Sequence, residues 1–564
     1  MPDINPPLPA GYDYDAINSD VLLHRARMKN GRLTLLSGAS YSALVLLHDD
    51  PQMTPQLLRK IRGFVRDGLT VAGPRPRHSP SLQGFPKCDQ KVKSLADDLW
   101  GQCDGTTVTE HPFGKGRVIC GPSLAGLFAA RGLKPDFEFT NSSPSAKLAF
   151  CHRLTDQADI YFLSNQRRQF ESADCTFRIS SKLPELWHPD TGQIELAPIW
   201  SQQDGRTTVH IQFEPAGSVF VIFRRPALQM DTVVAVSGPE RQPPAPAPPK
   251  IHIVRALYQA EDGAGTNDVT ATVAGLSNNG SLEILASNSQ FGGDPAFGHT
   301  KQLRVDYTLD GQPKTATVSE NEPLTLPPSA SEGEAPSWNA ASLDGRPCVR
   351  TSINGAFQLT TAAGKTLQVS VDDLPAPVQL TNDWDLAFPP DWGAPSQIHL
   401  DKLISWTDHT NQGVRYFSGT ATYQKDIEIP ADFLRQGREV WLDLGIVKNF
   451  AQVSLNGQLL ATLWKPPFRV NLTSVALPGI NRLQVKVTNL WPNRLIGDEQ
   501  LADDRQWDGD RLKAWPDWLL DGKPSPTGRL TFTTWRHWKK DDALPPSGLI
   551  GPVRLQPWQT VPAN

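Results

Sequence analysis

One short motif has the form of a nucleophile placed at a turn between a strand and a helix. The run Cys120-Gly121-Pro122-Ser123 ends an apolar strand-like segment and begins a helix-like one, where glutamine amidotransferases and hydrolases place a nucleophile. However, Ser123 is well explained as the N-cap of that helix, and no histidine with an acidic partner is visibly arranged for it. The structural interpretation is preferred, and a diverged amidotransferase-like hydrolase acting through Cys120 or Ser123 is kept as an alternative.

Paired carboxylates are a second source of chemistry, because glycoside hydrolysis needs an acid and a base or nucleophile on opposite sides of one bond. The long segment from Trp491 to Trp538 and the residues just after it offer, among other aspartates, Asp503, Asp504, Asp508, Asp510, Asp541 and Asp542. Nothing in the sequence fixes their separation, so we interpret them as solvated loop carboxylates. No cofactor is expected, although some of these groups, with backbone carbonyls, could hold a structural calcium ion of unknown ligands.

Tryptophan is the third candidate, because an indole can stack on a sugar ring while Arg, Asn and Asp bind the hydroxyls. The chain has 16 tryptophans, and all but Trp100, Trp187 and Trp200 lie from Trp338 onward. Most of them are expected in cores. The irregular segment alone contains six: Trp491, Trp507, Trp515, Trp518, Trp535 and Trp538. We therefore expect one or two of these six to face a groove.

The composition limits the class of protein. A chain of 564 residues is too long for one core and predicts about four domains. With 39% hydrophobic and 20% charged residues, most of it should fold. The formal charge of −4 gives no basic field for phosphates or anionic lipid. Neither nucleic acid nor a membrane is expected as a partner.

The cysteines and the amino terminus say little about the compartment. The first residues contain no basic and apolar regions of a secretory signal, and no run of 18 apolar residues predicts a membrane span. The cysteines lack metal-ligand spacing, so we interpret all of them as ordinary thiols: Cys88, Cys103, Cys120, Cys151, Cys175 and Cys348. The localisation is left unknown.

Residues 12–135 are predicted to form a small doubly wound α/β domain, flavodoxin-like in size. Short apolar runs predict strands at 42–47, 69–72 and 117–120. Thr54 is expected to cap a helix that starts at Pro55, and further helices are expected to end at Gly101 and Gly132.

The rest of the chain is predicted to be β structure, because apolar residues alternate with a period of two. Val209–Phe213 and Val219–Phe223 are interpreted as adjacent strands around Pro215-Ala216-Gly217, and turn pairs at Asp310-Gly311 and Asn456-Gly457 predict hairpins. Proline-rich segments suggest boundaries at 239–249 and 323–337. The expected parts are a β-sandwich over 136–236, a linker over 237–250, a small β domain over 251–328, and a β domain over 338–560 with a Trp-rich insertion at about 491–545.

The last domain resembles a known family. Its motifs are Tyr416–Tyr423, Trp441–Gly445, Asn456-Gly457, Leu463–Phe468, Asn489–Gly497 and Ser547–Arg554. They resemble the galactose-binding-like jelly roll that ends bacterial α-L-rhamnosidases of glycoside hydrolase family 106, which is related to the sugar-binding domain of family 2 enzymes such as β-mannosidases. Four upstream segments resemble the parts that follow the catalytic barrel in that family: Gly11–Ile17, Gly73–Leu82, Trp100-Gly101 and Asp159–Asn165.

The resemblance also exposes a difference. Family members carry their catalytic glutamates on a (β/α)8 barrel, which needs eight strand-helix units, whereas this sequence predicts about three. No catalytic residue can therefore be transferred to this chain. Residues 2–9 are interpreted as the stub of a connection to a missing barrel, and the missing signal peptide has the same explanation.

The resemblance implies an accessory portion of an α-L-rhamnosidase-like hydrolase in polysaccharide degradation, serving as scaffold and carbohydrate contact. A non-catalytic carbohydrate-binding protein is the main alternative. The expected partners are a rhamnose-containing glycan and a separate catalytic barrel polypeptide. By their place in the resembling motifs, the candidate sugar-binding residues are Trp464, Trp491, Arg494, Trp535 and Arg536.

Overall fold

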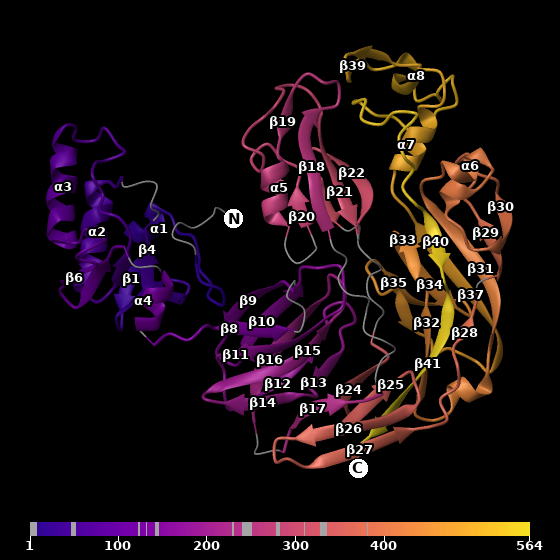
Figure 1. The fold of residues 1–564 in the computed structure, drawn as a ribbon, viewed down its shortest axis with the longest axis horizontal. Coiled ribbons are helices and arrows are strands. Elements are labelled where there is room, and N and C mark those ends of the chain that lie inside the picture. The colour runs from indigo at the N-terminus through magenta and orange to yellow at the C-terminus, as the bar shows by residue number, and fades with distance from the viewer. Residues whose placement is uncertain are drawn as a thin grey trace. The chain divides into compact units, whose positions relative to one another are not determined.

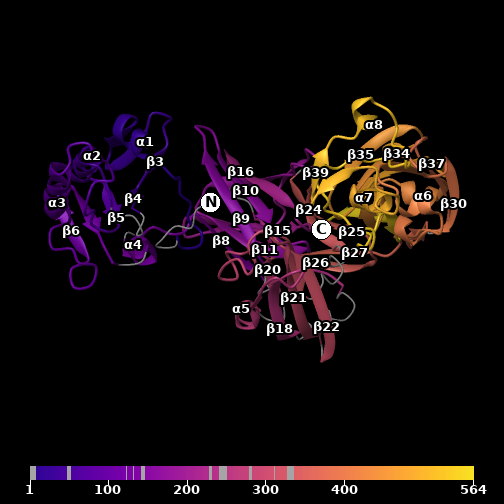
Figure 2. The same cartoon turned by 90° about the horizontal axis from the view of Figure 1, so that it is seen from above.

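The computed structural model describes residues 8–46, 52–121, 124–130, 132–141, 146–227, 231–239, 251–277, 282–309, 311–326, 336–343, 345–380 and 382–563. The chain divides into two compact units, one of residues 1–139, 175–180 and 203–207 and one of the remaining residues. Strands outnumber helices and form many separate sheets (Figures 1 and 2), so the fold is mainly β and multi-domain, as predicted. Among the described helices, none is long and apolar enough to cross a membrane.

The first unit contains an α/β sheet with helices on both faces. Its elements are β4 (Ala43–Val45), α2 (Pro55–Arg66), β5 (Thr70–Ala72), α3 (Lys87–Trp100), β6 (Glu110–Phe113), β7 (Gly116–Ile119) and α4 (Leu124–Ala130). Strands β4, β5 and β7 are parallel, and β6 pairs antiparallel with β7 at the edge. Val71 and Val118 pack with α2 and α3, whereas Ala72 and Ile119 pack with α4, and both views place these helices on opposite faces (Figures 1 and 2).

The predicted start of the first amphipathic helix is correct. The Thr54 hydroxyl accepts a hydrogen bond from the Leu57 N–H, and Pro55 occupies the first helical position. Most of the apolar stripe of α2 is buried, with Leu58 and Ile61 at 0% exposure. The predicted cap of α4, Ser123, lies outside the described residues.

A short helix and a small sheet precede β4, and the sequence pattern does not predict them. They are α1 (Ser19–His24), β1 (Ala26–Lys29), β2 (Arg32–Leu35) and β3 (Ser40–Tyr41). Strands of four residues or fewer contain too few alternating positions to be recognised from sequence.

Two sheets follow, with the orders β13-β12-β16-β10-β9 and β14-β15-β11-β8. Their strands are β8 (Phe137–Asn141), β9 (Leu148–Leu154), β10 (Asp159–Asn165), β11 (Glu171–Phe177), β12 (Lys182–Trp187), β13 (Ile194–Leu196), β14 (Trp200–Gln203), β15 (Arg206–Phe213) and β16 (Ser218–Pro226). The expectation that the strands around Pro215-Ala216-Gly217 are neighbours is wrong, because β15 and β16 belong to different sheets. Alternation shows which residues are buried and leaves the pairing partner open.

The small β domain consists of a four-stranded sheet β19-β18-β21-β22, a two-stranded sheet β20-β23 and one helix. Its elements are β18 (Ile251–Ala260), β19 (Thr266–Asp268), α5 (Thr270–Leu276), β20 (Leu282–Leu285), β21 (Lys301–Leu309), β22 (Gln312–Ser319) and β23 (Pro323–Leu326). Leu309 pairs with Gln312, which confirms the two-residue hairpin there. The boundary expected to begin at 323 is wrong at its start, because β23 pairs with β20. The proline-rich residues 240–250 lie outside the described residues.

Two large antiparallel sheets form the last β domain. Their orders are β24-β25-β41-β32-β36, with β28 also paired to β41, and β30-β29-β31-β37-β34-β35 (Figure 1). Both sheets contribute buried side chains to one core, such as Leu442 from β32 and Val485 from β37. Leu455 pairs with Gln458, as the Asn456-Gly457 turn predicts. A further sheet, β17-β26-β27, joins residues 233–237 to this part of the chain.

The elements of this domain and of the adjoining sheet are β17 (Val233–Ser237), β24 (Trp338–Leu343), β25 (Arg346–Thr351), β26 (Gly355–Thr361), β27 (Thr366–Val371), β28 (Val378–Gln379), β29 (Asn382–Ala387), β30 (Gln397–Lys402), η1 (Trp406–Asp408), α6 (Gln412–Arg415), β31 (Thr420–Ile429), η2 (Ala431–Leu434), β32 (Arg438–Asp443), β33 (Ile446–Lys448), β34 (Phe450–Leu455), β35 (Gln458–Leu463), β36 (Arg469–Asn471), β37 (Gly479–Thr488), β40 (Gly548–Gly551) and β41 (Arg554–Pro562).

Between β37 and β40 lies the Trp-rich segment of residues 491–545, which we call the insertion. It contains α7 (Pro492–Asp498), β38 (Gln506–Asp508), β39 (Arg511–Ala514) and α8 (Asp517–Leu520).

Candidate carbohydrate-binding site

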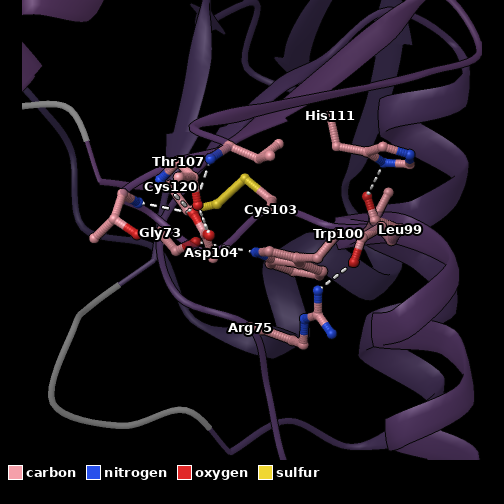
Figure 3. The surroundings of a disulfide bond; sticks show 12 residues. Gly73, Arg75, Leu99, Trp100, Cys103, Asp104, Thr107, His111 and Cys120 are labelled. Atoms are coloured by element: carbon pink, nitrogen blue, oxygen red, sulfur yellow. Dashed lines mark hydrogen bonds between the residues drawn. A yellow bond between two sulfur atoms is a disulfide. The ribbon is translucent and has the colours of Figure 1, made fainter.

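The cysteine at the first candidate motif is not a free nucleophile. Cys120, directly after β7, forms a disulfide with Cys103, which follows α3 (Figure 3). The expectation of ordinary thiols is therefore wrong for this pair, whereas Cys88, Cys151, Cys175 and Cys348 are free. Because a disulfide sulfur is not a thiolate, the structure contradicts the alternative of a hydrolase acting through Cys120. The end of β7 lies next to the end of α3, and this brings the two cysteines together. Their spacing of 17 residues in the sequence does not reveal this proximity.

The ends of the insertion are tied together by buried polar side chains. The Asn493 side-chain amide donates to the Ser547 hydroxyl at 2.7 Å and to the Pro545 carbonyl at 2.9 Å. Asn489 donates to the same hydroxyl at 3.0 Å. Asn493 and Ser547 are each 2% exposed, so these hydrogen bonds are shielded from water. They fix where α7 leaves the β domain and where the chain returns to β40.

A second polar centre is the half-buried Glu499, just after α7. Its Oε1 atom accepts hydrogen bonds from Arg505 Nη2 at 2.7 Å and from Arg529 Nη1 at 3.0 Å. The side chains of both arginines are 3% exposed or less. Arg529 Nε also lies 3.4 Å from an Asp504 oxygen. Buried charges are tolerated only when paired in this way, so these contacts hold the irregular chain in one conformation.

Asp503 is the third centre of this network. It accepts hydrogen bonds from Arg505 Nε at 2.9 Å, Trp507 Nε1 at 2.7 Å and Arg536 Nη2 at 2.5 Å. Burial alone would raise the pKa of this carboxyl, but the three donors outweigh burial and lower its pKa to about 2. The guanidinium groups of Arg505 and Arg536 also lie over the Trp507 ring, 4.8 and 5.0 Å from its centre.

The expectation that the aspartates of this segment are solvated loop carboxylates is wrong for Asp504, whereas Asp503 is exposed and is also paired with arginines. Asp503 and Asp504 are bound by arginine and hydroxyl groups, and the Asp504 side chain is only 5% exposed. Asp508, Asp510 and Asp541 are exposed, as expected. The reason is nonlocal, because Arg529 and Arg536 approach from the far end of the insertion.

Asp498, at the end of α7, links the network to the last part of the insertion. Its Oδ2 atom accepts hydrogen bonds from the backbone N–H groups of Leu530 and Thr531 at 3.1 and 2.8 Å and from the Thr531 hydroxyl at 2.6 Å. Its Oδ1 atom lies 3.0 Å from Arg494 Nη2. The segment that follows Arg529 is therefore held against the helix.

A pocket lies between α7 and this returning segment. It is a shallow surface hollow with a volume of about 10 Å³, which is room for about one water molecule. Its walls are formed by Leu495, Asp498, Glu499, Arg505, Arg529, Thr531, Thr533, Trp535, Arg536, His537 and Trp538. Its lining combines aromatic rings with a few fixed polar groups, as small-molecule sites do, but the hollow is too shallow to enclose a ligand.

The structure brings only some of the candidate sugar-binding residues together. Trp535 and Arg536 line the pocket, and Arg494 pairs with Asp498 in its wall. Trp491 is 58% exposed at the start of α7, with its ring edge-on to Trp392. Trp464 is not part of the pocket wall.

Trp464 lies at the end of β35 and is 60% exposed. The next residue, Lys465, reaches Glu214 at 2.6 Å and Asp190 at 3.1 Å, which lie in the connections of the two preceding sheets. Burial would lower the pKa of Lys465, but these two carboxylates outweigh burial and raise its pKa. The Leu463–Phe468 motif thus attaches one part of the second unit to another.

The other tryptophans of the insertion are occupied by packing. Trp507 is covered by two guanidinium groups, and Trp515 stacks on Phe532 with ring centres 5.4 Å apart. Trp518 meets the same phenylalanine edge-on at 6.1 Å. Trp535 and Trp538 are the members of the set that line the pocket.

Several pocket residues escape prediction from sequence. Arg505, Arg529 and Glu499 read as ordinary charges of a polar segment, and their burial depends on distant partners. Thr533 and His537 sit beside Trp535 in the chain, and that proximity is the available signal. In the described part of the chain, no group of three or more His, Cys, Asp or Glu side chains is arranged to hold a metal ion. The calcium ion therefore stays a prediction.

Comparisons with known proteins agree with this architecture. Residues 2–200 match the family model of glycoside hydrolase family 106, described as alpha-L-rhamnosidase. Residues 238–327 match a model for the C-terminal part of DnaJ-like protein C11. The latter range overlaps the small β domain.

Two relatives align with almost the whole chain. A putative beta-glucuronidase of Formosa agariphila is 31% identical over 636 aligned positions, covering 97% of this chain and 53% of the relative. The structure of a rhamnosidase from Novosphingobium sp. PP1Y aligns with a TM-score of 0.59 and 26% identity, covering 98% of this chain and 36% of that one. The chain spans about half the length of the curated relative that it matches.

These findings define first a class, that of multi-domain, mainly β proteins of the glycoside hydrolase type. Within it, the chain is similar to glycoside hydrolase family 106, as the sequence motifs indicate.

Proposed function

We propose that this chain is an accessory part of an α-L-rhamnosidase-like glycoside hydrolase, and that the pocket of the insertion binds a sugar unit of its polysaccharide. A catalytic (β/α)8 barrel needs eight parallel strands, whereas the largest sheets among the described residues have six strands and are antiparallel. The chemistry would be supplied by a barrel on another part of the protein or on a separate polypeptide.

The observation that carries the proposal is the exposed indole at a rigid pocket. Trp535 is 52% exposed although it lies in a segment held by buried ion pairs, and the Arg511 guanidinium lies 5.5 Å from the centre of its ring, which leaves the rest of the indole for a ligand. Exposing an aromatic ring on a well-ordered surface forgoes its burial energy, and stacking against the apolar face of a sugar would recover part of it.

Calorimetric titration of methyl α-L-rhamnoside and a rhamnose-containing oligosaccharide tests the proposal. Changing Trp535 to alanine should weaken binding at least tenfold, because the stacking surface is lost. The matched control is Trp515→Ala, which removes a tryptophan of similar exposure, 54%, that lies outside the pocket wall. Equal affinity of Trp535→Ala and the unchanged chain would contradict this site.

A companion variant, Trp464→Ala, separates the two candidate surfaces. If the sugar binds at the end of β35, this variant loses affinity and Trp535→Ala keeps it. We expect the reverse.

A further inference from the structure

Three polar side chains outside the insertion meet on one sheet. Ser172 and Asp174 belong to β11 and His210 belongs to β15, and these strands are neighbours in the sheet β14-β15-β11-β8. The Ser172 Oγ atom lies 2.9 Å from His210 Nε2, and the Asp174 Oδ1 atom lies 2.7 Å from His210 Nδ1. A serine, a histidine and an aspartate are therefore joined in the order that a hydrolytic triad requires.

The alternation of side chains along the strands places this trio on the accessible face of the sheet. Residues at every second position of a strand share a face, so Ser172 and Asp174 point to the same side of β11. The intervening Ala173 is buried, as is Val209 beside His210. The His210 and Asp174 side chains are 32% and 55% exposed, so a substrate can reach them from solvent.

The two hydrogen bonds determine where the imidazole carries its proton. At neutral pH a carboxylate has only acceptors, so His210 Nδ1 donates its proton to Asp174. In a neutral imidazole the other nitrogen is then an acceptor, and it receives the hydroxyl proton of Ser172. His210 Nε2 is thus a base directed at the serine, and Asp174 holds the ring in the required tautomer.

The same face also offers a donor for an oxyanion. Near the start of β15, Thr207 donates to the Ile179 carbonyl beyond the end of β11. Further along β15, His210 reaches Ser172 near the start of β11, so the two strands run antiparallel. Gln212, two residues after His210, therefore lies on the Ser172 side of the imidazole. Its exposed amide is placed to donate to the oxygen of a carbonyl under attack by Ser172.

We propose that Ser172, His210 and Asp174 form a hydrolytic triad that cleaves carboxylic esters. Ser172 Oγ attacks the carbonyl carbon while its proton passes to His210 Nε2. The bond to the leaving alcohol then breaks, and His210 gives that proton to the alcohol oxygen. A water molecule attacks the acyl-serine in the same way, which releases the carboxylic acid and restores the serine. Ser172 and His210 are the catalytic residues, and Asp174 is a positioning residue that acts through the imidazole.

The surface around the triad favours an ester with a short acyl group. Thr208 and Gln212, on either side of His210 on this face of β15, are polar. A long apolar chain would gain little from such a surface, since it would stay in contact with water. An acetyl ester is the simplest substrate of this class. This activity is separate from sugar binding, so either proposal can fail without the other.

Labelling of the full chain with a fluorophosphonate, followed by peptide mass mapping, tests the proposal. The reagent modifies a serine rapidly when a neighbouring base activates its hydroxyl. We expect Ser172 to be modified at least tenfold faster than Ser201, a half-buried serine of the neighbouring strand β14. The control Ser201→Ala should leave the labelling of Ser172 unchanged. Modification of Ser172 no faster than that of Ser201 would overturn the proposal.

Variants of the triad test whether its geometry is the cause. His210→Gln removes the base, and Asp174→Asn removes the carboxylate that fixes the tautomer. We expect each to slow the labelling of Ser172 at least tenfold, and Ser172→Ala to slow the hydrolysis of nitrophenyl acetate at least tenfold. A merely structural role would leave these rates unchanged in variants that keep their unfolding midpoint. Unchanged rates in folded variants would overturn the proposal, and labelling of the unchanged chain decides it if the variants do not fold.

Discussion

At the scale of single residues, Asp503 connects the parts of the insertion most directly. Its carboxylate accepts hydrogen bonds from Arg505 and Trp507, close in sequence, and from Arg536, which is 33 residues away. Charged hydrogen bonds of this kind contribute more than neutral ones. The position of Arg536 in the pocket wall therefore depends on the ionised state of Asp503.

The lowered pKa of Asp503, about 2 against an ordinary value of 3.8, predicts how stability changes in acid. The unfolded chain binds this proton at a higher pH than the folded one, so the stabilisation is complete above about pH 4 and lost as the pH falls toward 2. Asp503→Asn should lower the free energy of unfolding by about 2 kcal/mol at pH 7.

Thermal unfolding of both proteins between pH 7 and pH 2.5 measures this effect. The difference in midpoint should be constant down to about pH 4 and then shrink. A difference in midpoint that stays constant down to pH 2.5 would show that the charge of Asp503 is not the source of the stabilisation.

At the scale of single residues, few of the side-chain contacts could be predicted from the sequence. The motif matches drew attention to Trp535 and Arg536, which do line the pocket, and to Arg494, which stands behind it. They could not exclude Trp464, because its distance from the pocket follows from the order of strands in the sheet. The partners of Asp503 and Glu499 come from opposite ends of the insertion, and no periodicity marks such pairs.

At the scale of helices and strands, the sequence predicts those features that depend on contacts between neighbouring residues, such as the start of a helix or a tight turn. The Thr54 cap and Pro55 place the start of α2, and the Asn456-Gly457 pair fixes the register of β34 and β35. Residues 456 and 457 both have positive φ, 52° and 82°, as a tight two-residue turn requires. The pairing of β15 and β16 could not be predicted, because alternation is the same in either sheet.

The Cys103–Cys120 disulfide leads to a prediction about the first unit. It joins the residues that follow α3 and β7 across 17 positions, and closing a loop of this length contributes about 3 kcal/mol. Reduction with dithiothreitol should lower the unfolding midpoint of this unit, as should the double substitution Cys103→Ser/Cys120→Ser.

Calorimetric scans with and without the reductant provide the measurement, and the double variant is its own control. Reductant should have no effect on the double variant. If it lowers the midpoints of both proteins equally, the effect has another origin.

At the scale of the whole molecule, composition and length correctly predict a mainly β, multi-domain chain, and the motifs correctly predict its family. The hydrophobic pattern suffices for this, because each small domain buries its own alternating strands. The chain covers 53% of its curated relative and 36% of the related rhamnosidase. The activity of a complete protein is therefore part of the proposal.

The proposal predicts that this chain alone does not hydrolyse an aryl α-L-rhamnoside. The described residues offer no barrel on which an acid and a base could face each other across the glycosidic bond. Release of nitrophenol from nitrophenyl α-L-rhamnoside should stay at the level of buffer. Turnover above that level, reproduced in independently purified samples, would contradict the accessory role.

The central claim is that the insertion presents a sugar-binding pocket. A crystal structure of the chain soaked with methyl α-L-rhamnoside tests it most directly. We expect one sugar ring against Trp535, with its hydroxyls within hydrogen-bond distance of Thr533 or His537. A sugar found at Trp464, or a pocket that stays free of sugar at saturating concentration, would contradict it.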